Sequence, residues 1–201
     1  MWANIFFWMV KETMLIGIIL LCMGLSYIVG TIPFGHLMAS AKGIDIKNVG
    51  TGNPGATNVY KEVGPVYGVL VFFIDIGKGL IIPVIVIFMG SPIWVASICL
   101  FSLILGHVTP SPWKTPSGTG MAAAMGASLA LVPLGGLVCI IPAVIVLKIT
   151  KNSTYTGVCA FLIAMVCDWL IVRNFIEVGT VLVCALIILL KFLVQYRNLK
   201  D

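Results

Sequence analysis

Long apolar runs follow one another along most of the chain, and they constrain its fold more than any other feature. A membrane-spanning helix needs about 20 mostly apolar residues, and most of these runs approach or exceed that length. Only 9% of the residues are charged, and 201 residues leave no room for a soluble domain beside the spans. The sequence therefore predicts an all-α integral membrane protein. Its candidate spans are Leu15–Ala41, Val66–Met89, Pro92–Val108, Gly120–Leu147, Tyr155–Val172 and Glu177–Tyr196.

The run Gly120–Leu147 is ambiguous because Pro133, Gly135 and Gly136 interrupt it. It can be one long tilted helix, which gives six spans, or a hairpin that turns near Val132 and Pro133, which gives seven. Lysine and arginine collect on the cytosolic side of membrane proteins, so their distribution favours one reading.

With a hairpin, most of the basic residues share one side, and only Lys11 and Arg173 fall on the other. With a single helix this bias nearly vanishes. The sequence therefore predicts a bundle of seven transmembrane helices, with the N-terminus outside and the C-terminus in the cytosol. The basic residues on the cytosolic side are then Lys42, Lys47, Lys61, Lys114, Lys148, Lys151, Arg197 and Lys200.

The first residues, MWANIFFWMVKET, precede this pattern and are too short to span a membrane. They can form an interfacial amphipathic segment, with Trp2 and Trp8 at the level of the lipid headgroups, or they can result from a start codon chosen upstream of Met14. We therefore divide the chain into an N-terminal extension, residues 1–14, and a single membrane domain, residues 15–201.

Several classes of function lack support in the sequence. The six cysteines lie in apolar stretches without paired spacing, which argues against disulfides and metal sites. There is no basic soluble face for nucleic acid. The chain has no GxSxG, CxxC, HExxH or Walker motif, so we expect neither a metal nor a cofactor.

The predicted topology places the most polar segments on the cytosolic face, and two of them are rich in glycine. Gly43–Gly64 contains VGTGNPGATNVY, and Thr109–Gly120 contains PSPWKTPSGTG. Glycine lets backbone N–H groups converge on phosphate oxygens, and the run SGTG leads into a helix N-terminus at about Met121. The two segments together predict an anion site at the cytosolic mouth of the bundle, although flexible turns are the simpler alternative.

Three of the ionisable residues within or at the ends of apolar runs are candidates for a function. Asp75 and Lys78 have the i, i+3 spacing that lets them pair on one helix face. His107 ends a predicted helix beside the second glycine-rich segment. The pair can also be a helix-orienting ion pair, and the histidine can be a structural donor.

Three strings carry a resemblance to a known family. They are GTIPFG at 30–35, NVGTGNPGATNVYKEVGPVYGVLVFFIDIGKG at 48–79, and LGHVTP at 105–110. Together they resemble the bacterial acyl-phosphate:glycerol-3-phosphate acyltransferases, the PlsY family, from about Leu15 to the C-terminus. That family consists of seven-helix membrane enzymes with an external N-terminus. Its members transfer a fatty acyl group from acyl phosphate to glycerol 3-phosphate and release phosphate.

The resemblance implies roles for particular residues. As catalytic residues it implies Thr51, where the family has a serine, Lys61, where it has an arginine, Thr119 and Asn198. The residues that it places around the phosphates are Gly50, Gly52, Asn53, Ala56, Thr57, Asn58, Lys114, Gly118 and Gly120. Those that it implies as supporting residues are Asp75, Lys78, His107 and Arg197.

Two segments depart from the family pattern: the second glycine-rich segment and the C-terminal end of the chain. Thr119 stands where the family has a lysine, and Asn198 stands where it has a histidine. Two alternatives to a working acyltransferase therefore remain. One is a weakened or retargeted paralogue that binds an acyl chain or an anionic headgroup, and the other is a small membrane transporter. For the acyltransferase we expect acyl phosphate, glycerol 3-phosphate and membrane lipid as partners, a monomer as one possible state, and a location in the cell membrane with a cytosolic active face.

Overall fold

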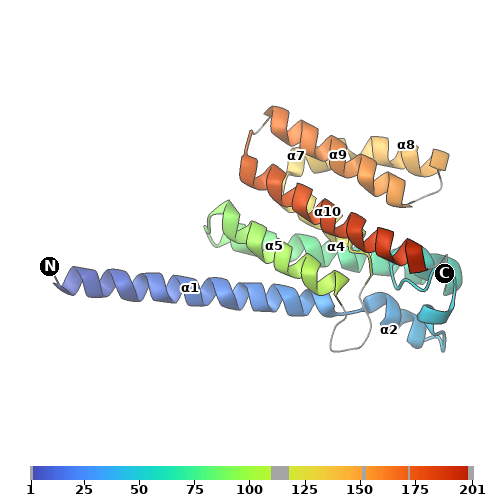
Figure 1. Ribbon diagram of the computed structural model, residues 1–201, viewed down its shortest axis with the longest axis horizontal. Coiled ribbons are helices and arrows are strands. Elements are labelled where there is room, and N and C mark those ends of the chain that lie inside the picture. Colours follow the sequence, from blue (N-terminus) through green and yellow to red (C-terminus); the bar gives the residue numbers. More distant parts are fainter. Residues whose placement is uncertain (1, 110–117, 151–152, 172, 199–201) are drawn as a thin grey trace.

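The computed structural model describes residues 2–109, 118–150, 153–171 and 173–198, and every regular element in these ranges is helical. Figure 1 shows how they are arranged. In chain order they are α1 (Trp2–Thr31), α2 (Phe34–Ser40), the 3-10 helix η1 (Ile46–Asn48), α3 (Ala56–Glu62), α4 (Pro65–Phe88), α5 (Ile93–Val108), α6 (Met121–Leu131), α7 (Pro133–Val138), α8 (Ile140–Thr150), α9 (Ser153–Ile171) and α10 (Phe175–Asn198).

The apolar helices confirm the all-α membrane class. Within the described residues, four segments are long and apolar enough to cross a membrane: Met9–Ser40, Pro65–Phe88, Pro133–Thr150 and Phe175–Val194. Three shorter apolar helices accompany them, namely Ile93–Val108, Met121–Leu131 and Tyr155–Ile171. The number of spans and the orientation of the termini stay predictions.

The sequence predicted one span over Leu15–Ala41, but this run is not one helix. The chain breaks at Ile32 and Pro33. Proline has no N–H to donate, and its ring disfavours the helical conformation of the residue before it. Helix α1 ends at Thr31, and α2 begins at Phe34 after Pro33 has adopted φ −89° and ψ 71°. Residues 2–13 continue into α1 without a break, and their interfacial position stays a prediction.

The run Gly120–Leu147 is also interrupted, at the position that the hairpin alternative required. Helix α6 ends at Leu131, Val132 leaves the helical conformation, and Pro133 takes the first position of α7. Proline is favoured at that position because its missing N–H would have no helical partner there. A single long helix over this run is therefore wrong.

Glycines let the central helices approach each other closely. The α-hydrogen side of Gly79 in α4 faces the carbonyl oxygen of Ala123 in α6, and Gly126 in α6 faces the carbonyl oxygen of Ile76 in α4. Helices α1 and α5 have the same reciprocal contact, between Gly30 and Leu103 and between Gly106 and Tyr27. Small residues at such crossings are typical of helix packing in membranes, where van der Waals contact replaces the hydrophobic effect.

We expect Gly79→Ala to destabilise the bundle by about 1–3 kcal/mol, because the added methyl group overlaps the Ala123 carbonyl oxygen and forces α4 and α6 apart. Gly77→Ala is the matched control, since its added carbon would come no closer than 4.0 Å to Ile81 Cδ1. Thermal unfolding of the two variants in detergent measures the difference. Equal melting temperatures would contradict the close α4–α6 contact.

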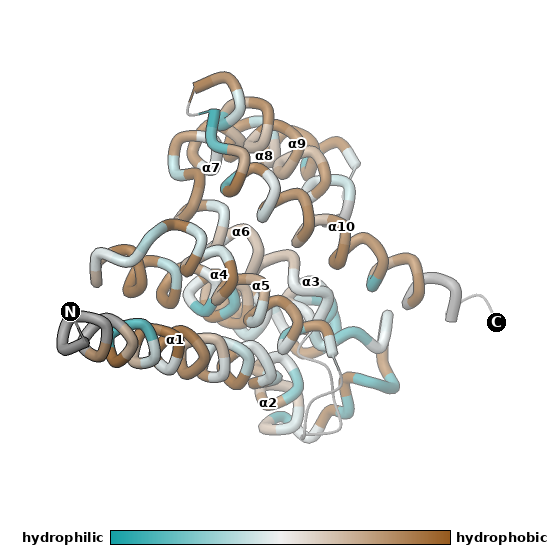
Figure 2. The backbone as a smooth tube through the Cα atoms, turned by 60° about the vertical axis from the view of Figure 1, so that its left-hand side comes forward, coloured by the Kyte–Doolittle hydropathy of each residue, from teal (hydrophilic) through white to brown (hydrophobic). Residues whose placement is uncertain are grey.

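The polar segment after α2 folds over its own small core. Ala39, Ile46, Val59 and Val71 are fully buried in one cluster that joins α2, η1, α3 and α4. Figure 2 shows hydrophilic chain around α2 and α3, while the long helices are mostly hydrophobic. The predicted loop Gly43–Gly64 is therefore partly helical, and its glycine-rich part is held between α2 and α3.

Candidate functional site

The first glycine-rich loop, residues 49–55, has a shape that Asn58 fixes. Gly50 and Gly52 have φ values of 56° and 65°, a region that side chains disfavour. Asn58 Oδ1 accepts a hydrogen bond of 3.0 Å from the backbone N–H of Thr51, and its Nδ2 donates one of 3.1 Å to the Val49 carbonyl. The amide that the sequence suggested as a phosphate donor is thus engaged in shaping the loop.

The loop also rests on α2. A Cβ atom at Gly35 would overlap the carbonyl oxygen of Pro54, so α2 lies directly against the end of the loop. A Cβ atom at Gly50 would come within 2.7 Å of Glu62 Oε1, so α3 closes the other side. The loop is therefore held from two directions.

The second glycine-rich segment, Gly118–Thr119–Gly120, leads into α6 as expected. Gly118 and Gly120 have φ values of 148° and 87°, which again favour glycine. Gly120 precedes Met121, the first residue of α6, so the first N–H groups of an 11-residue helix lie next to this segment. Such N–H groups have no partner within the helix and attract anions.

The structure brings the two glycine-rich segments together. A Cβ atom at Gly118 would be 3.5 Å from Gly55 Cα and 3.2 Å from His107 Nε2. A Cβ atom at Gly120 would be 3.7 Å from His107 Cδ2. Residues far apart in the sequence therefore meet above the end of α5, with His107 beneath them.

His107 is almost fully buried, with 2% of its surface exposed. Its Nδ1 atom has no hydrogen-bond partner among the described residues, and its Nε2 edge faces Gly118. A buried polar atom without a partner costs free energy and is often found at a functional site. His107 is thus placed to support the second segment from below.

The other predicted site residues lie at different depths. Thr51, Thr57 and Lys61 are exposed, and Asn53 and Ala56 are half-buried. Thr119 is half-buried between its two glycines. Lys114 lies outside the described residues, as do the side chains of Arg197 and Asn198, whose backbone forms the end of α10.

Asp75 and Lys78 form the ion pair that their spacing predicted. Lys78 Nζ lies 3.2 Å from Asp75 Oδ1, and both residues are buried, with 6% and 3% of their surfaces exposed, respectively. Lys78 Nζ also donates a hydrogen bond of 2.7 Å to the Ile32 carbonyl. The pair therefore connects α4 to the break between α1 and α2.

Sequence reasoning missed the parts played by Gly35 and Gly55. Gly35 occurs in the string GTIPFG, but its importance depends on a contact with Pro54 that no local pattern reveals. Gly55 stands out in the sequence only as part of the motif around Thr51, although it is the point where the second segment touches the first.

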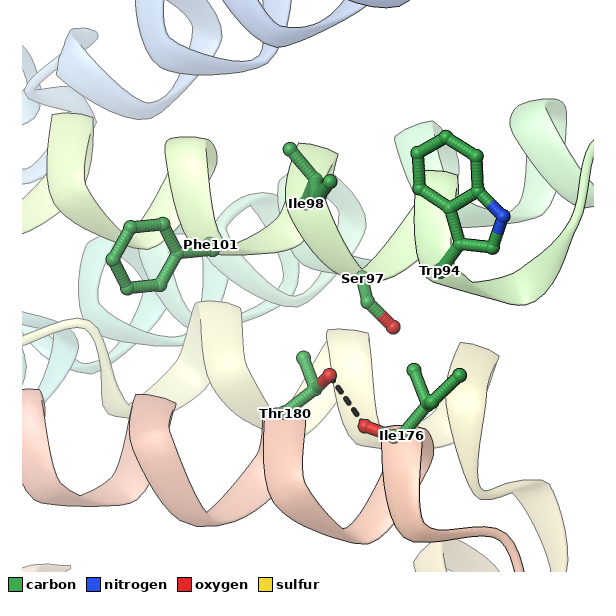
Figure 3. A pocket seen from close by; sticks show the side chains of 6 residues that line it. All are labelled: Trp94, Ser97, Ile98, Phe101, Ile176 and Thr180. Atoms are coloured by element: carbon green, nitrogen blue, oxygen red, sulfur yellow. Dashed lines mark hydrogen bonds between the residues drawn. The ribbon is translucent and has the colours of Figure 1, made fainter.

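A separate apolar groove lies between α5 and α10 (Figure 3). It has a volume of about 280 Å³, and Ser97 Oγ, which has no hydrogen-bond partner among the described residues, points toward α10. Thr180 also lines the groove, and its Oγ1 donates a hydrogen bond of 2.6 Å to the Ile176 carbonyl of its own helix. The lining residues are Trp94, Ser97, Ile98, Phe101, Ile176 and Thr180.

Comparison with known proteins identifies the family. A family model described as glycerol-3-phosphate acyltransferase matches residues 20–201. This chain belongs to the glycerol-3-phosphate acyltransferase family. The match covers both glycine-rich segments and all of the helices from α2 to α10.

Relatives in the glycerol-3-phosphate acyltransferase family are similar over most of the chain. The protein of that name from Geobacter sulfurreducens is 34% identical over 90% of this chain and 94% of its own length. Glycerol-3-phosphate acyltransferase 2 from Dehalococcoides mccartyi is 30% identical over 88% of this chain and 83% of its own. The Aquifex aeolicus acyltransferase is 42% identical over a shorter match, 54% of this chain and 57% of its own.

Two solved structures have the same fold. The crystal structure of PlsY, an integral membrane glycerol 3-phosphate acyltransferase, in its glycerol 3-phosphate form has a TM-score of 0.82 and 28% identity. Its lysophosphatidic acid form has a TM-score of 0.80 and 27% identity. Each comparison covers 90% of this chain and 91% of the PlsY chain.

Proposed function

We propose that this protein transfers a fatty acyl group from acyl phosphate to glycerol 3-phosphate, in the synthesis of phospholipids. The observation that carries the proposal is the contact of Gly118 with Gly55 and His107, which brings the two glycine-rich segments side by side. Family membership over residues 20–201 supports it and gives a transporter no support. No cofactor is needed for this reaction.

The reaction joins the acyl carbon to a hydroxyl oxygen of glycerol 3-phosphate. The bond between the acyl carbon and the phosphate oxygen of the donor breaks, and the phosphate leaves with the electron pair. The proton of the attacking hydroxyl passes to the phosphate of the acceptor itself, so the protein need not supply a base. What the protein supplies is binding, orientation and donors for the negative charge that develops on the leaving phosphate.

Three residues of this chain differ from those of the family at positions that we expect to contact the negatively charged phosphate. Thr51 keeps the hydroxyl of the serine that the family has at this position. Lys61 keeps a positive charge but loses the planar fork with which arginine grips two phosphate oxygens. Thr119 keeps a donor and loses a charge. We propose that these residues, with the backbone N–H groups of both glycine-rich segments and the side chains of Lys114 and Asn198, contact the phosphates.

We propose that the chain crosses the membrane seven times, with its N-terminus outside and the site on the cytosolic face, and that it acts as a monomer. Four long apolar segments and three shorter apolar helices support the count. The distribution of lysine and arginine supports the orientation.

Purified protein in lipidic mesophase, given acyl phosphate and glycerol 3-phosphate, tests the function. We expect release of inorganic phosphate together with lysophosphatidic acid in equal amounts. Phosphate release without glycerol 3-phosphate would indicate hydrolysis, and the absence of both products would contradict the proposal.

We propose that the acyl chain of the donor reaches the groove between α5 and α10. Along the axis of α5, Phe101 and Trp94 lie roughly 9 and 20 Å from His107, given a rise of about 1.5 Å per residue. Lipid chains of one leaflet span about 15 Å, so the distal part of a long chain reaches this groove. Gly120 lies beside Val108 of α5 and Ile188 of α10. The contact between α5 and α10 that forms the groove therefore extends to the second glycine-rich segment.

We expect Thr180→Phe to fill the groove and lower kcat/KM for long-chain acyl phosphates about tenfold relative to short-chain ones, since two methylene groups lose their burial at about 0.8 kcal/mol each. Gly179→Phe is the matched control, because that position faces open space on the same helix. The ratio of kcat/KM for the two donors is the measurement. An unchanged ratio in Thr180→Phe would place the acyl chain elsewhere.

A further inference from the structure

One turn of α4 contacts the supports of both glycine-rich segments. It contains Asp75, Lys78 and Gly79, and all three are buried. Lys78 reaches toward the break between α1 and α2, where its Nζ binds the Ile32 carbonyl at 2.7 Å and lies 5.1 Å from the centre of the Phe34 ring. The next residue, Gly79, lies against α6.

The Ile32 carbonyl lies where the helix is broken. It does not accept the N–H bond that a continuous helix would provide, and the Phe34 N–H reaches it at 3.1 Å in a tight turn. A carbonyl oxygen that loses its helical partner needs another donor, and a charged donor makes a stronger hydrogen bond than a neutral one. Lys78 therefore stabilises the broken conformation, and Asp75 Oδ1, which lies 3.2 Å from Lys78 Nζ, orients the Lys78 side chain.

The position of α2 then determines the position of the first glycine-rich loop. Gly35 follows the break by two residues and lies directly against the Pro54 carbonyl oxygen. Ala39 of α2 is packed in the same buried cluster as Val59 of α3. A shift of α2 would therefore move Pro54 and with it Gly55, the residue that touches Gly118.

The same turn of α4 also fixes the second segment. Gly79 lies against the Ala123 carbonyl oxygen, and a Cβ atom at Gly79 would be 3.0 Å from the backbone nitrogen of Ala127. Ala123 is in the first turn of α6, three residues after Gly120 in the chain. The α4 turn is thus the common support of the two segments.

We infer that the Asp75–Lys78 pair is a positioning device for glycerol 3-phosphate binding: it fixes the distance between the loop 49–55 and the segment 118–120 through the Ile32 carbonyl. This inference rests on the proposed function for its kinetic readout. The pair carries no net charge, so it acts on the substrate through backbone placement rather than through its own field. Its loss opens the site without unfolding the protein.

The double variant Asp75→Leu/Lys78→Met tests the inference. Replacing both members of a buried ion pair by apolar residues of similar size is often neutral or stabilising, and this offsets the lost hydrogen bond to the Ile32 carbonyl, so we expect a melting temperature close to that of the wild type. We expect the KM for glycerol 3-phosphate to rise about tenfold or more, since displacements of about 1 Å can reduce activity a hundredfold. Hydrogen exchange of the amides in residues 33–55 should be faster, while that of α9 and α10 is unchanged.

Two further variants separate positioning from general stability. Lys78→Arg keeps a charged donor and should retain most of the wild-type affinity for glycerol 3-phosphate. Lys191→Met removes a half-buried lysine from α10 and should leave the KM unchanged. A double variant with wild-type KM and wild-type exchange in residues 33–55 would overturn the inference.

The exchange measurement keeps the inference independent of the proposed function. If the wild-type protein releases no phosphate, the proposed function fails, and faster exchange in residues 33–55 still supports positioning while unchanged exchange rejects it. If the double variant does not fold, Gly35→Ala tests the same contacts from the side of the loop. A Gly35→Ala protein with wild-type exchange in residues 49–55 would contradict the inference.

Discussion

Thr51→Ala is expected to lower the rate of phosphate release about a hundredfold. Thr51 is exposed on the first glycine-rich loop, and its backbone N–H donates a hydrogen bond to Asn58 Oδ1 that the substitution leaves intact. Thr51→Ala removes only the hydroxyl and one methyl-sized branch of the side chain. Removal of one such donor to a developing negative charge typically costs ~3 kcal/mol of transition-state stabilisation. Steady-state phosphate release with saturating acyl phosphate and glycerol 3-phosphate measures the effect.

Thr51→Ser is the matched control for that measurement. It keeps the hydroxyl and removes only a methyl group, and it restores the residue that the family has at this position. We expect its rate to lie within a few-fold of the wild-type rate. If Thr51→Ala were as active as Thr51→Ser, the hydroxyl would have no part in the reaction, and the first loop would serve only to shape the site.

Thr119→Lys is expected to raise the rate, by up to about a hundredfold, because it adds a positive charge where the phosphate leaves. Thr119 lies half-buried between Gly118 and Gly120, and these two glycines lie against His107, the first of them also against Gly55. A lysine side chain is long enough to reach the space between the two segments from this position. Phosphate release and the KM for glycerol 3-phosphate are the measurements.

Thr119→Met is the control for side-chain bulk, since it adds a long side chain without a charge. A large gain in Thr119→Lys alone means that the scaffold is intact and that a charge is the missing element. Equal rates in wild type, Thr119→Lys and Thr119→Met would favour a retargeted paralogue with a different acceptor. We expect the gain, because the two glycine-rich segments already meet, as the proposed site requires.

Much of the fold could be predicted from the sequence, because a membrane restricts the chain to a few structures. Apolar length gives the spans, and Pro133 ends α6 for a reason that is local to the chain. Proline at position 33 has the same effect, yet the break before α2 was missed because the apolar run continues through it. A hydropathy pattern records where the chain is apolar and does not record where it turns.

The candidate site was predicted in part. Glycine-rich segments in two places on one face suggested an anion site, and Gly118 and Gly55 are indeed adjacent. The contact of Gly35 with Pro54 and the bond from Lys78 to the Ile32 carbonyl could not be predicted, because each joins residues that only the folded chain brings together. Asn58 looked like a substrate donor for the same reason: its partners at Thr51 and Val49 are visible only in three dimensions.

A crystal structure of this protein with bound glycerol 3-phosphate is the most direct test of the central claim that the two glycine-rich segments form one anion site. We predict that its phosphate oxygens contact groups of both residues 49–55 and residues 118–120, with His107 beneath them. A phosphate bound to one segment alone, or a separation of Gly55 from Gly118 that admits lipid between them, would contradict the account.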